Sequence, residues 1–299
     1  MNCVTLCLDI GGTEIKAAPV QNGTLLSPIQ YFPANAHGSF EELSAHFSHI
    51  LRTLYQLAPE GSKIDGVHFA FPGPFDYENG VCLMEGLDKY EAFFQKNLRE
   101  LFFPFCSDFL QQPSQIRFIN DAAAFCLGEM HFGGAVGSRK TLAVCIGTGC
   151  GSAFGQNGAL APEGTPHVPP HGYLYPTPFL DGCLDDYLSK RGLVALALET
   201  LGEPLEGAAL SKMAQSGNPL AKECFLKFGQ CIADGLAPIL SSFAPDCLCL
   251  GGQVTRSFAL FGEPLSALCQ EKNIRLSITA DTSEHAIQGL CTLKKSKTA

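Results

Sequence analysis

Residues 6–18 are Leu6-Cys7-Leu8-Asp9-Ile10-Gly11-Gly12-Thr13-Glu14-Ile15-Lys16-Ala17-Ala18, and Gln21-Asn22-Gly23 follow shortly after them. An apolar run that ends at a Gly-Gly break is typical of a buried strand. Asn-Gly is the strongest short-range signal for a tight hairpin turn. The stretch therefore predicts a strand, a glycine turn, a second strand, an Asn-Gly turn and a third strand.

The same stretch has the chemistry of a phosphate site. Gly11 and Gly12 let backbone N–H groups approach an anion closely, because no Cβ stands in the way. The Thr13 hydroxyl adds a donor, and Asp9 at the strand end can hold a hydrated Mg²⁺. These groups suit a nucleoside triphosphate. Taken alone, however, Gly-Gly-Thr after a strand is more often an ordinary turn.

A second copy of the pattern favours the phosphate site. It consists of Leu142-Ala143-Val144-Cys145-Ile146-Gly147-Thr148-Gly149-Cys150-Gly151-Ser152-Ala153-Phe154, followed by Gln156-Asn157-Gly158. Ile10 and Ile146 are 136 positions apart, a period far longer than the roughly 20–50 residues of a solenoid repeat. We therefore expect two similar halves whose glycine turns, with Gly147, Thr148, Gly149 and Gly151 in the second, face one cleft.

Composition limits the class of protein. The chain has 299 residues, of which 46% are hydrophobic and 16% charged, and its net charge is −9. A chain of this length and apolar content can bury the cores of two domains and does not have the composition of a disordered protein. The acidic charge argues against nucleic acid and anionic membrane surfaces as partners.

Cysteine usage and the chain start bear on the compartment. The 14 cysteines form no Cys-x-x-Cys pair, and many lie in apolar runs. The first expected strand begins within a few residues of Met1, which leaves no room for a signal peptide. No run approaches the roughly 18 apolar residues of a membrane span. We expect a cytoplasmic protein with reduced, mostly buried cysteines.

Two segments of the first half have clear signals. Ser39 and Glu42 form a capping box ahead of apolar residues at helical spacing up to Ala58, which predicts a helix. The apolar run 67–71 predicts a strand, and Pro72-Gly73-Pro74 stops it. That rigid turn either places Gly73 at the cleft or is plain turn chemistry. A second helix is expected through Leu98 and Leu101.

Asp121 is the candidate for acid–base chemistry. It follows the expected strand 116–119 and precedes the expected helix 122–130. Ligands of open α/β sheets bind at the carboxyl ends of the strands, where a carboxylate can take a proton from a substrate hydroxyl. The helix dipole favours its ionised form. The alternative is that Asp121 only caps the helix.

The second half adds a long loop and a third glycine turn. Residues 163–172 are rich in Gly, Pro and His, and irregular loops of this kind are often functional. The two His residues of this loop, His167 and His171, and the later Cys183 have poor spacing for zinc. A long helix is expected over 220–243, and Gly251-Gly252 follows the strand 247–250. The last expected helix spans 285–293, and a basic tail begins at Lys294.

The motifs, taken in order, resemble the ROK family of bacterial sugar kinases, within the actin, hexokinase and Hsp70 ATPase superfamily. The resemblance runs nearly end to end. It rests on 9–13 as the first phosphate motif, 119–122 ahead of Leu127-Gly128-Glu129 as the catalytic segment, 147–151 as the second phosphate motif and 251–252 as the adenosine turn.

The resemblance implies the fold and the site. It implies a two-domain α/β, ribonuclease-H-like (actin-like ATPase) fold with duplicated βββαβαβα-type halves, and ATP with Mg²⁺ and a sugar in the cleft. We place the halves at 1–115, with the C-terminal helix of about 285–299, and at 116–284. Asp121 would be the general base, and Asn120 and Gly73 would lie at the sugar.

The chain departs from the family pattern at two places. The Glu-x-Gly-His segment that grips the sugar corresponds here to Glu163-Gly164-Thr165-Pro166-His167, which is one residue longer. The family's zinc cysteines are largely replaced, since Tyr173-Leu174-Tyr175-Pro176 and then Gly182-Cys183-Leu184-Asp185 stand in that region. No zinc site is therefore expected, and Asp185 takes the place of a sugar-binding Glu.

These observations predict an ATP-dependent kinase of a hexose or N-acetylhexosamine, with a small-molecule sugar as its partner and a homodimer as a possibility by analogy. One alternative is a sugar-responsive repressor, which would need an N-terminal helix-turn-helix that these residues do not provide. The other is a non-catalytic sugar sensor that kept the fold. Retention of Asp9 and Asp121 argues against the sensor.

Overall fold

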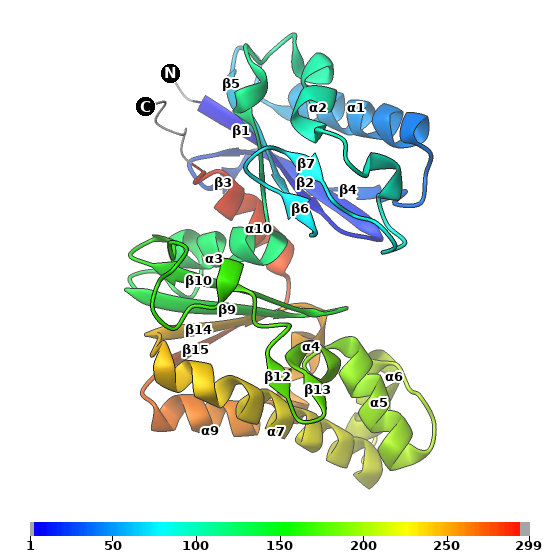
Figure 1. Ribbon diagram of the computed structural model, residues 1–299, viewed down its shortest axis with the longest axis vertical. Coiled ribbons are helices and arrows are strands. Elements are labelled where there is room, and N and C mark those ends of the chain that lie inside the picture. Colours follow the sequence, from blue (N-terminus) through cyan, green and yellow to red (C-terminus); the bar gives the residue numbers. More distant parts are fainter. Residues whose placement is uncertain (1–2, 294–299) are drawn as a thin grey trace. The chain divides into compact units, whose positions relative to one another are not determined.

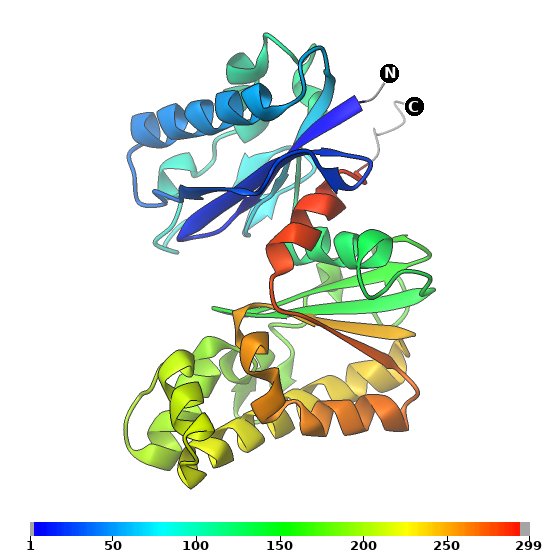
Figure 2. The same cartoon turned by 180° about the vertical axis from the view of Figure 1, so that it is seen from behind.

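The computed structural model describes residues 3–293 and divides into two compact units (Figures 1 and 2). The first unit runs to Gly128 and resumes at Ser283, and the second is Glu129–Thr282. The expected boundary near residue 115 therefore differs from the observed one. The polar stretch there is only a surface turn between a helix and the next strand of the same sheet, in which Gln115 Oε1 accepts the backbone N–H groups of Gln111 and Gln112. The basic tail lies outside the described residues.

The first unit is built on one mixed sheet with the order β3-β2-β1-β5-β8, to which β4 adds by pairing with β2. β1 pairs antiparallel with β2 and parallel with β5, and β5 pairs parallel with β8. Asn22 and Gly23 both have positive φ, as the expected hairpin turn requires. The strands are β1 (Cys3–Ile10), β2 (Glu14–Gln21), β3 (Thr24–Leu25), β4 (Gln30–Pro33), β5 (Lys63–Ala70) and β8 (Ile116–Ile119), with a small hairpin of β6 (Phe75–Asp76) and β7 (Val81–Cys82).

The second unit repeats this plan. Its sheet has the order β11-β10-β9-β14-β15, with the same succession of antiparallel and parallel pairs. Asn157 and Gly158 again have positive φ. The strands are β9 (Lys140–Ile146), β10 (Cys150–Gln156), β11 (Ala159–Leu160), β14 (Cys247–Gly251) and β15 (Arg275–Thr279), with a hairpin of β12 (Pro178–Phe179) and β13 (Gly182–Cys183). The expectation of two similar halves is confirmed.

Helices pack on both sheets and bury their apolar faces. In α1, Ser39 and Glu42 form the expected capping box, and the helix turns Leu43, Phe47 and Leu54 into the core. Figure 1 shows α1 and α2 along the first sheet and α7 and α9 along the second. The helices are α1 (Phe40–Leu57), α2 (Leu98–Cys106), α3 (Asp121–Phe132), α4 (Leu184–Tyr187), α5 (Lys190–Leu201), α6 (Gly207–Gln215), α7 (Pro219–Ser242), α8 (Phe258–Phe261), α9 (Glu263–Glu271) and α10 (Thr282–Leu290).

Each unit has its own hydrophobic core. The first is rich in phenylalanine and leucine, and the rings of Phe47 and Phe102 stack there with their centroids 4.8 Å apart. Cysteines contribute to both cores, with Cys106 in the first and Cys224 in the second, as small buried hydrophobes do. None of the helices within residues 3–293 is long and apolar enough to cross a membrane.

Helices α3 and α10 pack backbone against backbone within the first unit. A Cβ added at Gly128 would lie 1.9 Å from the carbonyl oxygen of His285, and one added at Gly289 would lie 2.1 Å from that of Ala124. Two helices approach this closely only where glycine leaves out the side chain. α10 follows the last strand of the second sheet in sequence, yet it packs in the first unit through these glycines.

A buried histidine connects β5, an inner strand of the first sheet, to α10. His68 on β5 is 5% exposed, and its Nδ1–H donates to the Leu290 carbonyl oxygen at 2.8 Å. Burial lowers the pKa of His68 to about 4, although the hydrogen bond opposes this. The folded protein therefore holds His68 neutral at pH values where the unfolded chain protonates it.

This arrangement predicts a loss of stability in mild acid. Because the folded pKa lies below the unfolded value of about 6.5, stability is present above pH 6.5 and falls as the pH drops toward 4, by about 2 kcal/mol between pH 7 and 5. Urea unfolding at the two pH values measures it. His68→Gln should flatten the dependence, whereas His49→Gln on the exposed face of α1 should not. An equally steep loss in His68→Gln would contradict this assignment.

Candidate functional site

The two glycines of the first turn serve different purposes. A Cβ at Gly11 would lie 2.7 Å from the Glu14 carbonyl oxygen, which also accepts the Gly11 N–H at 3.0 Å. Gly11 is thus needed for the turn itself. No atom lies within 4 Å of a Cβ added at Gly12, so the backbone there faces open space. An anion can approach Gly12, and Thr13 beside it is exposed.

Tyr90 supports this turn. Its side chain is fully buried, and its hydroxyl donates to the Gly11 carbonyl oxygen at 2.8 Å. Burial, and then the negative charge of Asp9, raise the pKa of the Tyr90 phenol above its usual range, so that it remains a donor. Nothing in the local sequence distinguishes Tyr90, because the contact joins residues 79 positions apart.

The parallel strands bring the first unit's candidates to one edge of the sheet. Asp9, near the end of β1, is in register with Ala70 at the end of β5, which is in register with Ile119 at the end of β8. The residues that follow these positions therefore leave the sheet at the same edge. Asp9 is partly buried there and lies opposite Lys16 on β2.

Asn120 caps α3. Its Oδ1 accepts the backbone N–H groups of Ala122 and Ala123 at 3.0 and 3.3 Å. Asn120 therefore provides the N-cap of α3, and Asp121 Oδ1 also accepts the Ala122 N–H at 2.9 Å. The side chain of Asp121 remains exposed. Although the side chain reaches solvent, the protein atoms packed around its carboxyl partly desolvate it and raise its pKa, and the Ala122 N–H opposes that rise.

Gly73 and Asn120 meet at Tyr77. Asn120 Nδ2 lies 3.4 Å from the Tyr77 hydroxyl, which donates to the Phe71 carbonyl oxygen at 2.9 Å. A Cβ at Gly73, whose bond to Pro74 is cis, would lie 3.4 Å from the same hydroxyl. The oxygen and the nitrogen of the Asn120 side-chain amide thus both bond to other residues of the protein, so the residue expected at the sugar also has a structural role.

The second glycine turn follows β9. The Gly147 N–H donates to the Gly149 carbonyl oxygen at 2.9 Å, and no atom lies within 4 Å of a Cβ built at Gly147. At Gly149 a Cβ would lie 2.8 Å from Asp185 Oδ1. Thr148 is exposed, and Gly151 lies in β10 opposite Cys145. As in the first unit, one glycine faces open space and another makes room for the chain.

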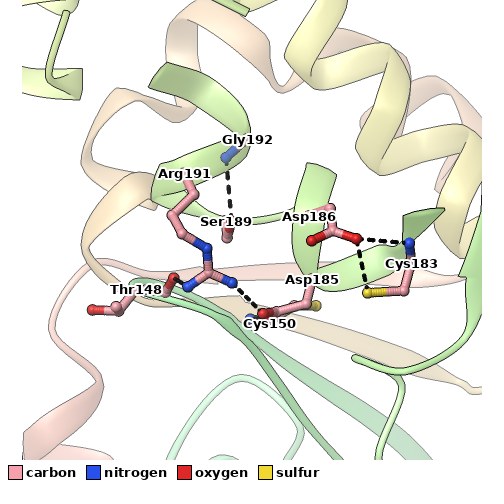
Figure 3. A network of polar contacts seen from close by, with 8 residues as sticks. All are labelled: Thr148, Cys150, Cys183, Asp185, Asp186, Ser189, Arg191 and Gly192. Atoms are coloured by element: carbon pink, nitrogen blue, oxygen red, sulfur yellow. Dashed lines mark hydrogen bonds and ion pairs between the residues drawn. The ribbon is translucent and has the colours of Figure 1, made fainter. Parts of the chain in front are cut away.

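Asp185 lies against this turn (Figure 3). Its Oδ1 accepts the Cys150 N–H at 2.6 Å, and its Oδ2 forms an ion pair with Arg191. Arg191 in turn donates to the Thr148 carbonyl oxygen at 3.0 Å. Both carboxylate oxygens of Asp185, which the sequence suggested for sugar binding, are thus engaged within the chain. Arg191 had no signal in the sequence.

Residues of the long loop 163–172 contact one another. The Glu163 carboxylate accepts the His171 N–H at 3.1 Å and lies 3.8 Å from His171 Nδ1. His167 is exposed and has a positive φ. The His171 ring contacts that of Tyr173, with centroids 5.7 Å apart. Across residues 3–293, no three His, Cys, Asp or Glu side chains gather as a metal site would require.

The third glycine turn packs on the end of β9. Gly252 has a φ of 98°, and a Cβ there would lie 2.3 Å from the Ile146 carbonyl oxygen. Thr255 Oγ1 donates to the Gly252 carbonyl oxygen at 2.7 Å. Gly252 is therefore required by the fold, and Gly251 before it pairs with both neighbouring strands.

Comparison with known proteins places these features in a family. The family model described as ROK matches residues 5–282. The chain is 29% identical to a glucokinase of Streptomyces coelicolor over 171 residues, 49% of this chain and 54% of the relative. It is 23% identical to an N-acetyl-D-glucosamine kinase of Aliivibrio salmonicida over 86% of each protein. The match thus spans about half the length of the first relative.

Solved structures share the fold. The chain aligns with a ROK family glucokinase of Streptomyces griseus, whose structure holds glucose and AMPPNP, over 96% of this chain and 97% of the other, with a TM-score of 0.71 and 20% identity. The expected two-domain, actin-like α/β fold is confirmed by this match. With the family model covering most of its length, the chain belongs to the ROK family.

Proposed function

We propose that the protein is an ATP-dependent kinase that transfers the γ-phosphoryl group of ATP to a hydroxyl of a hexose or N-acetylhexosamine. The observation that carries this proposal is the Asn120 cap, which leaves the exposed Asp121 carboxylate at the start of α3, on the sheet edge that also holds Asp9 and the first glycine turn. Membership of the ROK family and the named relatives support it.

Each group has a role in this proposal. Asp121 orients and deprotonates the attacking sugar hydroxyl as the general base, for which its raised pKa is suited. The turns 11–13 and 147–151 bind the phosphates, because Gly12 and Gly147 leave room for an anion. Gly251 and Gly252 shape the adenosine side. Asp9 would hold a hydrated Mg²⁺, and such an ion would supply charge neutralisation on the transferred phosphoryl group.

The sugar-binding residues and the substrates are proposed from the contacts of the loop 163–172 and from the names of the relatives. Exposed His167 is free of the Glu163–His171 contact and is the leading candidate for gripping the sugar. Gly73 and Asn120 of the first unit and Glu163 of the second are the other residues proposed to bind the sugar. Glucose-like and N-acetylated hexoses are the proposed substrates, since the relatives are named for both. A cytoplasmic location and a homodimer complete the proposal.

A coupled ADP-release assay tests the activity. Mg-ATP is supplied with glucose, mannose, fructose, N-acetylglucosamine or N-acetylmannosamine, and a sample without sugar is the control. We expect ADP release that depends on one of these sugars. Thermal stabilisation by a sugar without ADP release from any of them would overturn the kinase and favour a sugar sensor.

A further inference from the structure

Residues at the start of α5 donate hydrogen bonds to the backbone carbonyl groups of the second glycine turn. The Lys190 backbone N–H donates to the Gly147 carbonyl oxygen at 2.8 Å, and the Arg191 guanidinium donates to that of Thr148 at 3.0 Å (Figure 3). The helix is capped just before these residues by Ser189, whose Oγ accepts the Gly192 N–H. The two carbonyls are thus tied to a structured helix end.

Tying the carbonyls fixes the direction of the amides. A peptide unit is planar and trans, so its C=O and N–H point in opposite directions. The carbonyls of Gly147 and Thr148 point to α5, and the N–H groups of Thr148 and Gly149 must therefore point away from it. Successive N–H groups aimed to one side form an anion-binding concavity. The open space at Gly147 adjoins it.

Asp185 completes the support. One carboxylate oxygen accepts the Cys150 N–H at 2.6 Å, and the other pairs with Arg191. The carboxylate is only 23% exposed, whereas the Arg191 side chain is 57% exposed. Asp185 therefore holds the guanidinium where it reaches Thr148. Arg191 in turn neutralises a carboxylate that would otherwise repel an anion beside the turn.

We propose that Arg191 and Asp185 are positioning residues, which hold the turn 147–150 in the conformation that binds a polyphosphate. On this proposal Asp185 supports nucleotide binding rather than sugar binding. The inference rests on the proposed function only in taking a nucleotide as the ligand. The guanidinium fork matters as well as its charge, because one planar group bridges a carbonyl and a carboxylate.

Binding measurements test this without turnover. Isothermal titration with Mg-AMPPNP, and separately with glucose and N-acetylglucosamine, is applied to the wild type, Asp185→Asn, Arg191→Ala and Arg191→Lys. We expect Kd for Mg-AMPPNP to rise about tenfold in all three variants, as for the loss of a charge-assisted hydrogen bond, with the sugar Kd unchanged. Arg191→Ala should be the weakest, and adding Asp185→Asn to it should restore part of the affinity.

The control is the surface Arg–Asp pair at the other end of β9. Arg139 Nε lies 3.9 Å from Asp246 Oδ2, and Arg139→Ala should bind both ligands as the wild type does. A raised Kd for the sugar in Asp185→Asn, with the Kd for Mg-AMPPNP unchanged, would overturn the inference. So would a wild-type Kd for Mg-AMPPNP in Arg191→Lys. Failure of the wild type to bind Mg-AMPPNP would also overturn it. Nucleotide binding without sugar-dependent ADP release would instead reject the proposed function alone.

Discussion

Turnover in Asp121→Asn is expected to fall by about 10²–10⁴-fold, the usual contribution of a general base. Asparagine has nearly the same shape and can still accept the Ala122 N–H, which Asp121 Oδ1 now accepts at 2.9 Å. The start of α3 should therefore persist, since Asn120 provides the cap. The variant loses only the ability to take a proton from the sugar hydroxyl.

Two measurements examine this variant. The ADP-release assay gives kcat, and titration with the best sugar gives a Kd that should match the wild type. Because desolvation raises the pKa of Asp121, activity of the wild type should decline on the acid side from a pH above the ordinary carboxyl value of 3.8. Asp108→Asn, at an exposed position beyond α2, is the matched control. Unchanged kcat in Asp121→Asn would remove Asp121 as the base.

Gly128→Ala should strongly destabilise the first unit. The new methyl group would lie 1.9 Å from the His285 carbonyl oxygen, and neither partner is a flexible side chain that can move aside. Overpacking of this kind costs about 3 kcal/mol, which exceeds the roughly 1 kcal/mol that alanine gains over glycine in a helix. Helices α3 and α10 would have to separate, and Gly289, which packs against Ala124 in the same contact, would be displaced.

Urea unfolding followed by circular dichroism measures the loss. Gly207→Ala is the control, because it also lies in a helix but its added methyl group would meet only Leu193 Cδ2, at 3.4 Å. That variant should be as stable as the wild type or slightly more so. Equal stability of the two variants would show that α3 and α10 adjust to the methyl group at little cost.

Local signals predicted the elements well. The capping box of Ser39 and Glu42, the two Asn-Gly turns and the duplicated strand–turn–strand pattern depend on residues close together in sequence, and all are present. The expected boundary near residue 115 and the division after Gly128 differ because the boundary depends on contacts between distant residues. A polar stretch indicates a surface turn, but only the pairing of β8 with β5 decides to which unit the next strand belongs.

The supports of the site could not be predicted in the same way. Tyr90 reaches Gly11, and Arg191 reaches Thr148, across 79 and 43 positions. Asp185 was suggested for the sugar because it stands where the family pattern has a sugar-binding Glu, and that position in a motif gives no information on which donors fold against it. Asn120 was suggested for the sugar as well, and the motif gave no indication that its Oδ1 also caps α3. Motif spacing identified where the site lies, and tertiary contacts decide what each side chain does there.

The two glycine turns owe their shape to residues of their own units. Tyr90 fixes the first and the start of α5 fixes the second, and neither support requires a ligand. The loss of backbone entropy in each turn therefore occurs when the chain folds. A ligand that binds to such a turn does not have to order it, and more of the interaction free energy is left for affinity.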